Sequence, residues 1–260
     1  CVVSAPGTQA IIQILPRLRP TGAKVCVLGP TYAEHEACWR AGGHRVEAVS
    51  QIDRLADPWD VVVVVNPNNP DGRVLKPDFL LGLAGQLARR GGLLIVDEAF
   101  ADTAPETSLS AHADHPGLIV LRSFGKFFGL AGLRLGFALA APGEIRRLTR
   151  ALGPWAVGGP ALALGARALK DKAWIDETRE KLAKAGESLR ELLNDRGLKD
   201  LGGTSLFHLA GHEKAQNLFE SLGRAGILVR PFAEAPDRLR FGLPASKKDE
   251  ARLAAALGGL

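Results

Sequence analysis

The chain of 260 residues contains no methionine and a single tyrosine, Tyr32. A protein of this size normally uses several methionines in its core, and here not even an initiator is present. We therefore expect that the chain begins inside a longer gene product, unless modified methionines are missing from the sequence.

Cysteine is also scarce, with three residues, Cys1, Cys26 and Cys38, and no Cys-x-x-Cys pair. The odd count and the spacing argue against a disulfide framework and against a zinc ribbon, so a reducing cytoplasm is the expected compartment. His35, Cys38 and His44 could be read as metal ligands, but they straddle a predicted helix and the next strand without a fourth partner. We expect a core or surface role for them and no metal.

The longest hydrophobic runs are residues 61–65 and 93–96, and both are far shorter than the roughly 20 residues that cross a bilayer. No segment resembles a signal peptide. The net charge of +5 and the isoelectric point near 9.3 could reflect a nucleic-acid partner, but the basic residues are scattered among acidic ones. An anionic small substrate explains the charge equally well, so we expect neither a membrane nor a nucleic acid as partner.

Short strands alternate with amphipathic helices over the first 140 residues. Strands are expected at 24–28, 61–65, 93–96 and 117–121, and the runs at 61–65 and 93–96 are typical of strands that are buried on both faces. Helical patterns occur at 8–16, 34–42 and 77–90, and a further strand is expected at 134–140. This order predicts an α/β fold with a mostly parallel central sheet and helices on both faces.

The pattern changes after residue 142, and we expect a large domain at 1–150 and a small α+β domain at 151–260. The second part begins with helices, including a long charged one at 172–196. Strands are then expected at 204–209, 227–230 and 239–241, with helices at 213–225 and at the end of the chain. No internal repeat or low-complexity tract is visible.

A glycine-rich stretch around Lys126 contains the most distinctive chemistry of the chain. Ser123 precedes this lysine by three residues and Arg134 follows it by eight. A lysine that attacks a carbonyl must be neutral, and burial beside another cation would lower its pKa toward neutrality. Ser123 and Arg134 would suit a phosphate. The alternative is a surface lysine in a glycine-rich loop.

Polar residues follow the predicted strands, where open α/β sheets bind ligands. Two prolines make the segment 66–72, Asn-Pro-Asn-Asn-Pro-Asp-Gly, a rigid loop, and Asp97 follows the next strand. Near the amino end, the turn Gly7-Thr8-Gln9 opens a predicted helix. Both a phosphate site and a plain helix cap are open readings of this turn. Motifs of other phosphate-binding folds are absent from the sequence.

The spacing of Ser123, Lys126 and Arg134 resembles the Schiff-base signature of fold-type I pyridoxal-phosphate enzymes, the aminotransferase class I/II superfamily. The resemblance implies that Lys126 binds pyridoxal 5'-phosphate and that Asp97 is the charge partner of its ring nitrogen. Tyr32 would stack on the ring and Asn69 would donate to the phenolic oxygen. The cofactor phosphate would be held by Gly7, Thr8, Gln9, Ser123 and Arg134.

Substrate residues come from the same resemblance. Arg238, on a predicted strand, would fork the substrate carboxylate, with Arg240 on the same face. Arg240 or Arg230 would meet a phosphate, because the likeness is to enzymes that use phosphorylated amino substrates. Members of this family carry an N-terminal segment ahead of the Gly-Thr turn, so we expect that segment to be missing here, and a homodimer.

Within the family the chain is similar to histidinol-phosphate aminotransferases and to the threonine-phosphate decarboxylases of cobalamin synthesis. Phe100, where the family commonly has tyrosine, the Gly7-Thr8-Gln9 turn and the segment around Trp155 favour the decarboxylases. The expected reaction is thus decarboxylation of threonine phosphate to an aminopropanol phosphate, with transamination of histidinol phosphate as the alternative. An idle aminotransferase-like domain of a DNA-binding regulator is a further alternative, although no helix-turn-helix is visible.

Overall fold

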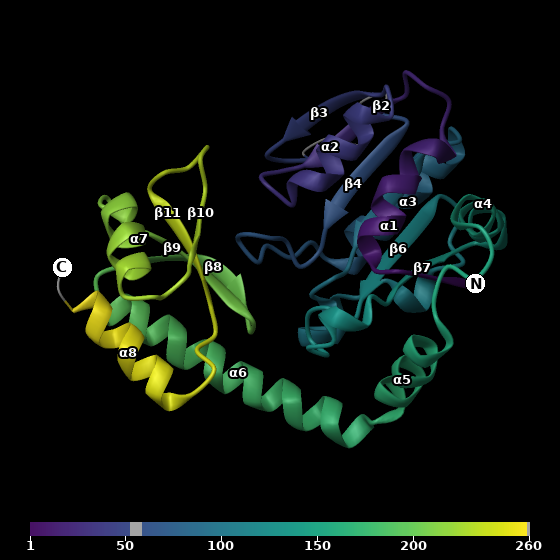
Figure 1. Ribbon diagram of the computed structural model, residues 1–260. Helices are drawn as coiled ribbons and strands as arrows, with labels where there is room; N and C mark the ends of the chain where they lie inside the picture. The colour runs from purple at the N-terminus through teal and green to yellow at the C-terminus, as the bar shows by residue number, and fades with distance from the viewer. Residues whose placement is uncertain (53–58, 259–260) are drawn as a thin grey trace. The chain divides into compact units, whose positions relative to one another are not determined.

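The computed structural model describes residues 1–52 and 59–258. These residues form two compact units, each with its own sheet (Figure 1). The first unit comprises Cys1–Asn69 and Val74–Asp171, and the second comprises Pro70–Arg73 and Lys172–Leu260. This division lies beyond the boundary expected near residue 150, because the helix α5 (Gly159–Lys170) clusters with the first unit.

A seven-stranded sheet organises the first unit, in the order β1-β7-β6-β5-β4-β2-β3. The strands β2 to β6 pair in parallel, whereas β7 is antiparallel to both β6 and β1. The sheet is therefore mostly parallel, as predicted. Its strands are β1 (Val2–Ala5), β2 (Lys24–Leu28), β3 (Arg45–Val49), β4 (Val61–Val65), β5 (Leu93–Asp97), β6 (Leu118–Ser123) and β7 (Gly136–Ala140).

Helices cover both faces of this sheet, which confirms the predicted α/β fold (Figure 1). One face packs against α1 (Thr8–Ile14), α2 (Ala33–Ala41) and α4 (Pro142–Leu152) around the buried Trp39. The other packs against α3 (Pro77–Arg89) and Leu109. The β-branched run of β4 is buried along its whole length, because both of its faces meet apolar side chains.

Short 3₁₀ helices complete the first unit, namely η1 (Leu15–Leu18), η2 (Ala101–Thr103), η3 (Pro105–Thr107), η4 (Ser110–His112) and η5 (Ala131–Leu133). Three of them, η2 to η4, form the connection between β5 and β6. Of the other two, η1 continues α1 and η5 leads into β7.

The second unit contains a four-stranded antiparallel sheet in the order β10-β11-β9-β8 and three helices. Its core gathers apolar residues of the sheet and of the helices. The elements are α6 (Lys172–Asp195), β8 (Lys199–Thr204), β9 (Phe207–Gly211), α7 (Ala215–Arg224), β10 (Arg230–Pro231), β11 (Arg238–Gly242) and α8 (Lys247–Leu257).

The single strand expected at 204–209 is wrong, because a hairpin occupies this region. Ser205 and Leu206 separate β8 from β9, which pair antiparallel. Gly202 and Gly203 lie at a register shift in β8, and glycine lowers the strand signal of a segment, so the first arm of the hairpin was not apparent.

Candidate active site

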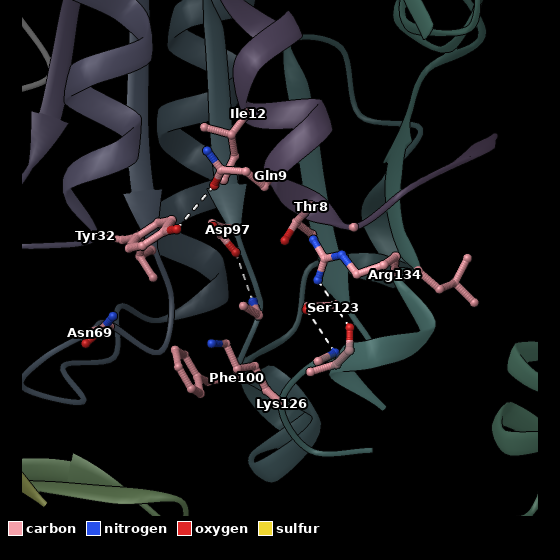
Figure 2. Close-up of a pocket in the computed structure, with 16 residues that line it drawn as sticks. Thr8, Gln9, Ile12, Tyr32, Asn69, Asp97, Phe100, Ser123, Lys126 and Arg134 are labelled. Carbon is pink, nitrogen blue, oxygen red and sulfur yellow. Dashed lines mark hydrogen bonds between the residues drawn. The ribbon is translucent and has the colours of Figure 1, made fainter. Parts of the chain in front are cut away.

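The carboxyl ends of β4, β5 and β6 meet at one edge of the large sheet, and the antiparallel β7 begins at the same edge. A cavity of about 200 Å³ opens there (Figure 2). Side chains that follow several strands converge on such an edge, which makes it the usual ligand site of open α/β sheets. The cavity is lined by Gly7, Thr8, Gln9, Ile12, Tyr32, Val65, Asn69, Asp97, Ala99, Phe100, Ser123, Gly125, Lys126, Ala131, Arg134 and Leu135.

One corner of the cavity combines two hydroxyl groups with a guanidinium. Thr8, Ser123 and Arg134 gather there (Figure 2). A Cβ on Gly7 would lie 2.6 Å from Nη2 of Arg134, and a Cβ on Gly136 would lie 2.5 Å from the Thr8 amide nitrogen. Only glycine therefore lets these groups come together. The resulting donors and positive charge suit a phosphate dianion.

Asp97 is the buried carboxylate of the cavity, with a residue exposure of 3%. Its Oδ1 accepts the Ala99 amide at 3.0 Å, and its Oδ2 lies 2.9 Å from Nε2 of His35. His35 is fully buried on α2, and its Nδ1 has no hydrogen-bond partner among the described residues. These two contacts fix the carboxylate in one orientation toward the cavity.

His35 is a site residue that the sequence analysis missed. It was expected to have a core or surface role, and it does lie in the core, but its partner is the carboxylate of the site. The contact joins residues 62 apart in the sequence, so no local pattern reveals it. The available signal was its place in the first turn of the helix that follows Tyr32.

Tyr32 precedes α2 and lies at the mouth of the cavity, 40% exposed. Its hydroxyl donates to Oε1 of Gln9 at 3.2 Å, and Gln9 in turn donates to Glu34. Partial burial and the nearby carboxylates of Glu34 and Asp97 raise the pKa of Tyr32, so the phenol stays neutral. Because the Gln9 side chain is engaged here, a phosphate contact by Gln9 would come from its backbone.

Lys126 enters the cavity from a turn that aromatic packing holds in place. Phe124 stacks on Phe128 with ring centroids 4.5 Å apart, and the Gly129 amide donates to the carbonyl of Lys126 at 2.9 Å. The Lys126 Nζ lies 5.4 Å from the centroid of the Phe100 ring. The expected burial of Lys126 is not found, because its side chain extends into the open cavity and is exposed.

Two of the three asparagines in the loop after β4 brace its backbone. Asn66 exchanges hydrogen bonds with the backbone of Leu75, and Asn68 bonds Thr31 and the carbonyl of Pro30. Asn69 instead lines the cavity (Figure 2). The sequence motif thus separates into a structural part and a part that reaches the site.

The arginines predicted for the substrate belong to the second unit. Arg230 on β10 pairs in register with Arg240 on β11, and burial together with the charge of Arg230 lowers the pKa of Arg240. Arg238 is 42% exposed at its side chain and lies 3.6 Å from the Asp237 carboxylate. Arg230, Arg238 and Arg240, which we call the arginine strip, lie on the paired strands β10 and β11. Their positive charge favours an anionic ligand.

Within residues 1–52 and 59–258 no three His, Cys, Asp or Glu side chains are grouped so that they could hold a metal. None of the helices in this part of the chain has the length and apolar character of a membrane span.

The nine residues predicted to bind the cofactor all line the cavity: Gly7, Thr8, Gln9, Tyr32, Asn69, Asp97, Ser123, Lys126 and Arg134. A phosphate corner, a buried carboxylate, an aromatic ring and a lysine are the groups that pyridoxal phosphate requires. The residues present therefore fit this cofactor, and the role of each stays a prediction.

Comparison with known proteins finds one matching family model and several similar proteins. The family model "Aminotransferase class I and II" matches residues 1–257. A threonine-phosphate decarboxylase from Pseudomonas aeruginosa is 48% identical over 99% of this chain and 78% of its own length, and one from Sinorhizobium sp is 46% identical over 97% and 75%. A histidinol-phosphate aminotransferase from Moorella thermoacetica is 30% identical over 86% of this chain and 62% of its own length.

A solved structure shows the same architecture. The histidinol-phosphate aminotransferase from Clostridium acetobutylicum superposes with a TM-score of 0.89 at 24% identity, over 99% of this chain and 83% of that one. At this identity the likeness concerns the fold.

Proposed function

Because the chain belongs to the aminotransferase class I and II family, we propose that it is a pyridoxal-phosphate-dependent decarboxylase. The proposed reaction converts L-threonine O-3-phosphate to (R)-1-aminopropan-2-yl phosphate and carbon dioxide, a step of cobalamin synthesis. The observation that carries the proposal is the identity of 48% and 46% to two threonine-phosphate decarboxylases over nearly the whole chain. The aminotransferase relative is at 30%.

Different residues of the cavity would hold the phosphate, the ring and the phenolic oxygen of the cofactor. Thr8, Ser123 and Arg134 would bind its phosphate, with backbone groups of Gly7 and Gln9. Tyr32 would pack on its ring, and Asn69 would donate to its phenolic oxygen. When bound, pyridoxal phosphate supplies an electron sink for the negative charge that develops at the reacting carbon.

Asp97 and Lys126 act on the chemistry itself. The Asp97 carboxylate is oriented by the Ala99 amide and His35, and would pair with the protonated ring nitrogen of the cofactor. Lys126 would bind the cofactor covalently through Nζ. The substrate amino group would displace Lys126 from the cofactor, so that Nζ again carries its own protons. Loss of carbon dioxide leaves the reacting carbon in need of one proton, and we assign Lys126 Nζ to deliver it.

The substrate carries a carboxylate and a phosphate, and the arginine strip of the second unit offers one partner for each. We assign the carboxylate to Arg238 and the phosphate to Arg240 or Arg230. The lowered pKa of Arg240, caused by burial and by Arg230, supports an anion at this place, because a bound anion would relieve the repulsion between the two guanidinium groups.

Two product assays decide between the reactions. The purified enzyme is incubated separately with threonine phosphate and with histidinol phosphate plus 2-oxoglutarate, while carbon dioxide and glutamate are measured. Carbon dioxide without glutamate supports the proposal. Strong glutamate formation from histidinol phosphate, with no carbon dioxide from threonine phosphate, would assign the chain to the aminotransferases.

We further propose a homodimer that works in the cytoplasm, where Cys1, Cys26 and Cys38 stay reduced. Trp155 is 95% exposed, and Leu162, Leu164 and Leu169 expose apolar surface on α5. A second copy of the chain is the partner that would cover them. Sedimentation analysis should give twice the monomer mass, and Trp155→Ser should shift the protein toward the monomer. A wild type that sediments as a monomer contradicts the assignment.

A further inference from the structure

A charged network around Glu98 and Arg122 lies on the face of the large sheet that is opposite to the cavity. Asp97 is the last residue of β5 and Glu98 follows it directly, while Arg122 and Ser123 are the last two residues of β6. Because side chains alternate along a strand, Asp97 and Ser123 face the cavity while Glu98 and Arg122 face the opposite side. The network therefore adjoins two residues of the site without entering it.

Glu98 is fully buried and accepts several hydrogen bonds. Its Oε1 accepts the Leu109 amide at 2.5 Å, and its Oε2 accepts the hydroxyl of Ser108 at 2.5 Å and that of Ser110 at 3.3 Å. Arg122 Nη1 lies 3.2 Å from the same Oε2. Glu98 thus ties the strand end of β5 to the connecting segment and to β6.

Arg122 completes the network from the neighbouring strand. Its Nη1 donates to Ser108 at 2.9 Å and to Ser110 at 3.0 Å, while its Nη2 donates to Asp102. These partners lie on η2, η4 and the segment between them. One guanidinium therefore bonds the first part and the middle of the connection that begins with the cavity residues Ala99 and Phe100.

Stability of the fold alone is a poor explanation of this arrangement. Burial raises the pKa of the Glu98 carboxyl, against the bonds from Ser108, Leu109 and Arg122. Buried ion pairs repay such desolvation only in part, and well-packed apolar residues often replace them without loss. Because the network of Glu98 and Arg122 borders the site, it is better explained by its effect on the positions of the neighbouring site residues.

Resting on the proposed cofactor site, we propose that Glu98 and Arg122 are positioning residues, which fix Asp97 and Phe100 on one strand end against Ser123 and the Lys126 turn on the other. The Ala99 amide, which orients Asp97, follows Glu98 directly. A shift of Glu98 therefore moves both the carboxylate and its donor. Displacements of about 1 Å at such groups can change rates by about 100-fold.

The test compares Glu98→Gln with Glu187→Gln, which removes an exposed Glu–Arg pair on α6. For each protein the dissociation constant of pyridoxal phosphate, the pH midpoint of the visible absorption band, and kcat and KM are measured. Glu98→Gln should weaken cofactor binding by about 10- to 100-fold, as loss of an outer partner does at metal sites, shift the band and lower kcat more than it raises KM. Glu187→Gln should match the wild type.

Ser108→Ala provides a milder variant, since it deletes one hydroxyl that bridges Glu98 and Arg122, and it answers the question if Glu98→Gln does not fold. It should change the same three quantities in the same direction and to a smaller extent. If the folded variants bind pyridoxal phosphate with wild-type affinity and show the wild-type absorption band, the positioning role is overturned, even if their melting temperatures are lowered. The proposed function would still stand in that case. A wild type that takes up no pyridoxal phosphate overturns both.

Discussion

Replacing His35 by phenylalanine tests how far the site depends on the hydrogen bond between this histidine and Asp97. The ring edge lies against Tyr32, with centroids 6.1 Å apart at 85°, and phenylalanine keeps this contact and most of the volume. The change removes one hydrogen bond, from Nε2 to the Asp97 carboxylate at 2.9 Å. It also removes Nδ1, a buried atom without a partner among the described residues.

The expected size follows from these contacts. A hydrogen bond to a charged group contributes about 1.5–3 kcal/mol. If the lost energy acts on the transition state, turnover falls about 10- to 100-fold. The free energy of unfolding should change less than turnover does. Asp97 Oδ2 loses its histidine partner, which is unfavourable, but the buried Nδ1 that has no partner among the described residues is also removed, and the two effects partly cancel. A glutamine at position 35 can donate to Asp97 and should restore part of the rate.

His44 offers a matched control for this experiment. It is also a buried histidine, with Nε2 bonded to the Pro16 carbonyl at 3.0 Å and an edge contact to Trp39. Its Nδ1 has no partner in the part of the chain that the structure describes. His44→Phe should lower the melting temperature slightly and leave kcat unchanged. Steady-state kinetics and thermal melts of both variants decide. The reasoning is refuted if His35→Phe keeps kcat within about twofold, or if His44→Phe loses as much.

Three further substitutions test the assigned roles. Asp97→Asn should retain the cofactor in an equilibrium binding assay but lower turnover by about 1000-fold, because a fixed charge is lost, and near-normal turnover would remove Asp97 from the mechanism. Tyr32→Leu should raise the dissociation constant of pyridoxal phosphate about 2- to 10-fold through lost ring contact, and unchanged affinity would argue against stacking. Arg238→Lys keeps the charge but loses the fork, so kcat/KM for threonine phosphate should fall clearly. If it does not, while Arg240→Lys does reduce kcat/KM, the carboxylate belongs to Arg240.

The inner parallel strands of the first unit were predictable because burial on both faces leaves a plain mark in the sequence, whereas no range was predicted for the edge strand β3, which is mostly accessible. The expected ranges 24–28 and 61–65 agree with β2 and β4. The edge strand β1 was missed, since its four residues are mostly accessible and carry no such run. The hairpin of β8 and β9 was predicted as a single strand, because Gly202 and Gly203 weaken the strand pattern of its first arm.

Nine of the cavity residues could be named from the sequence, because the spacing of Ser123, Lys126 and Arg134 resembles the signature of a known family and because polar residues follow the predicted strands. Lys126, Asp97 and Asn69 come from separate strand ends, and topology alone brings them together. The partners of these residues were not predictable. His35 and Arg122 reach their carboxylates through tertiary contacts, which depend on packing between elements and leave no periodic pattern.

The covalent bond between Lys126 and the cofactor is the central claim, and peptide mapping after reduction tests it most directly. The enzyme is loaded with pyridoxal phosphate, reduced with borohydride and digested, and the labelled peptide is identified by mass spectrometry. The account predicts a visible band that disappears on reduction, a label on Lys126, and no label and no band in Lys126→Ala. A label on another lysine, or a wild type that never takes up the cofactor, would contradict it.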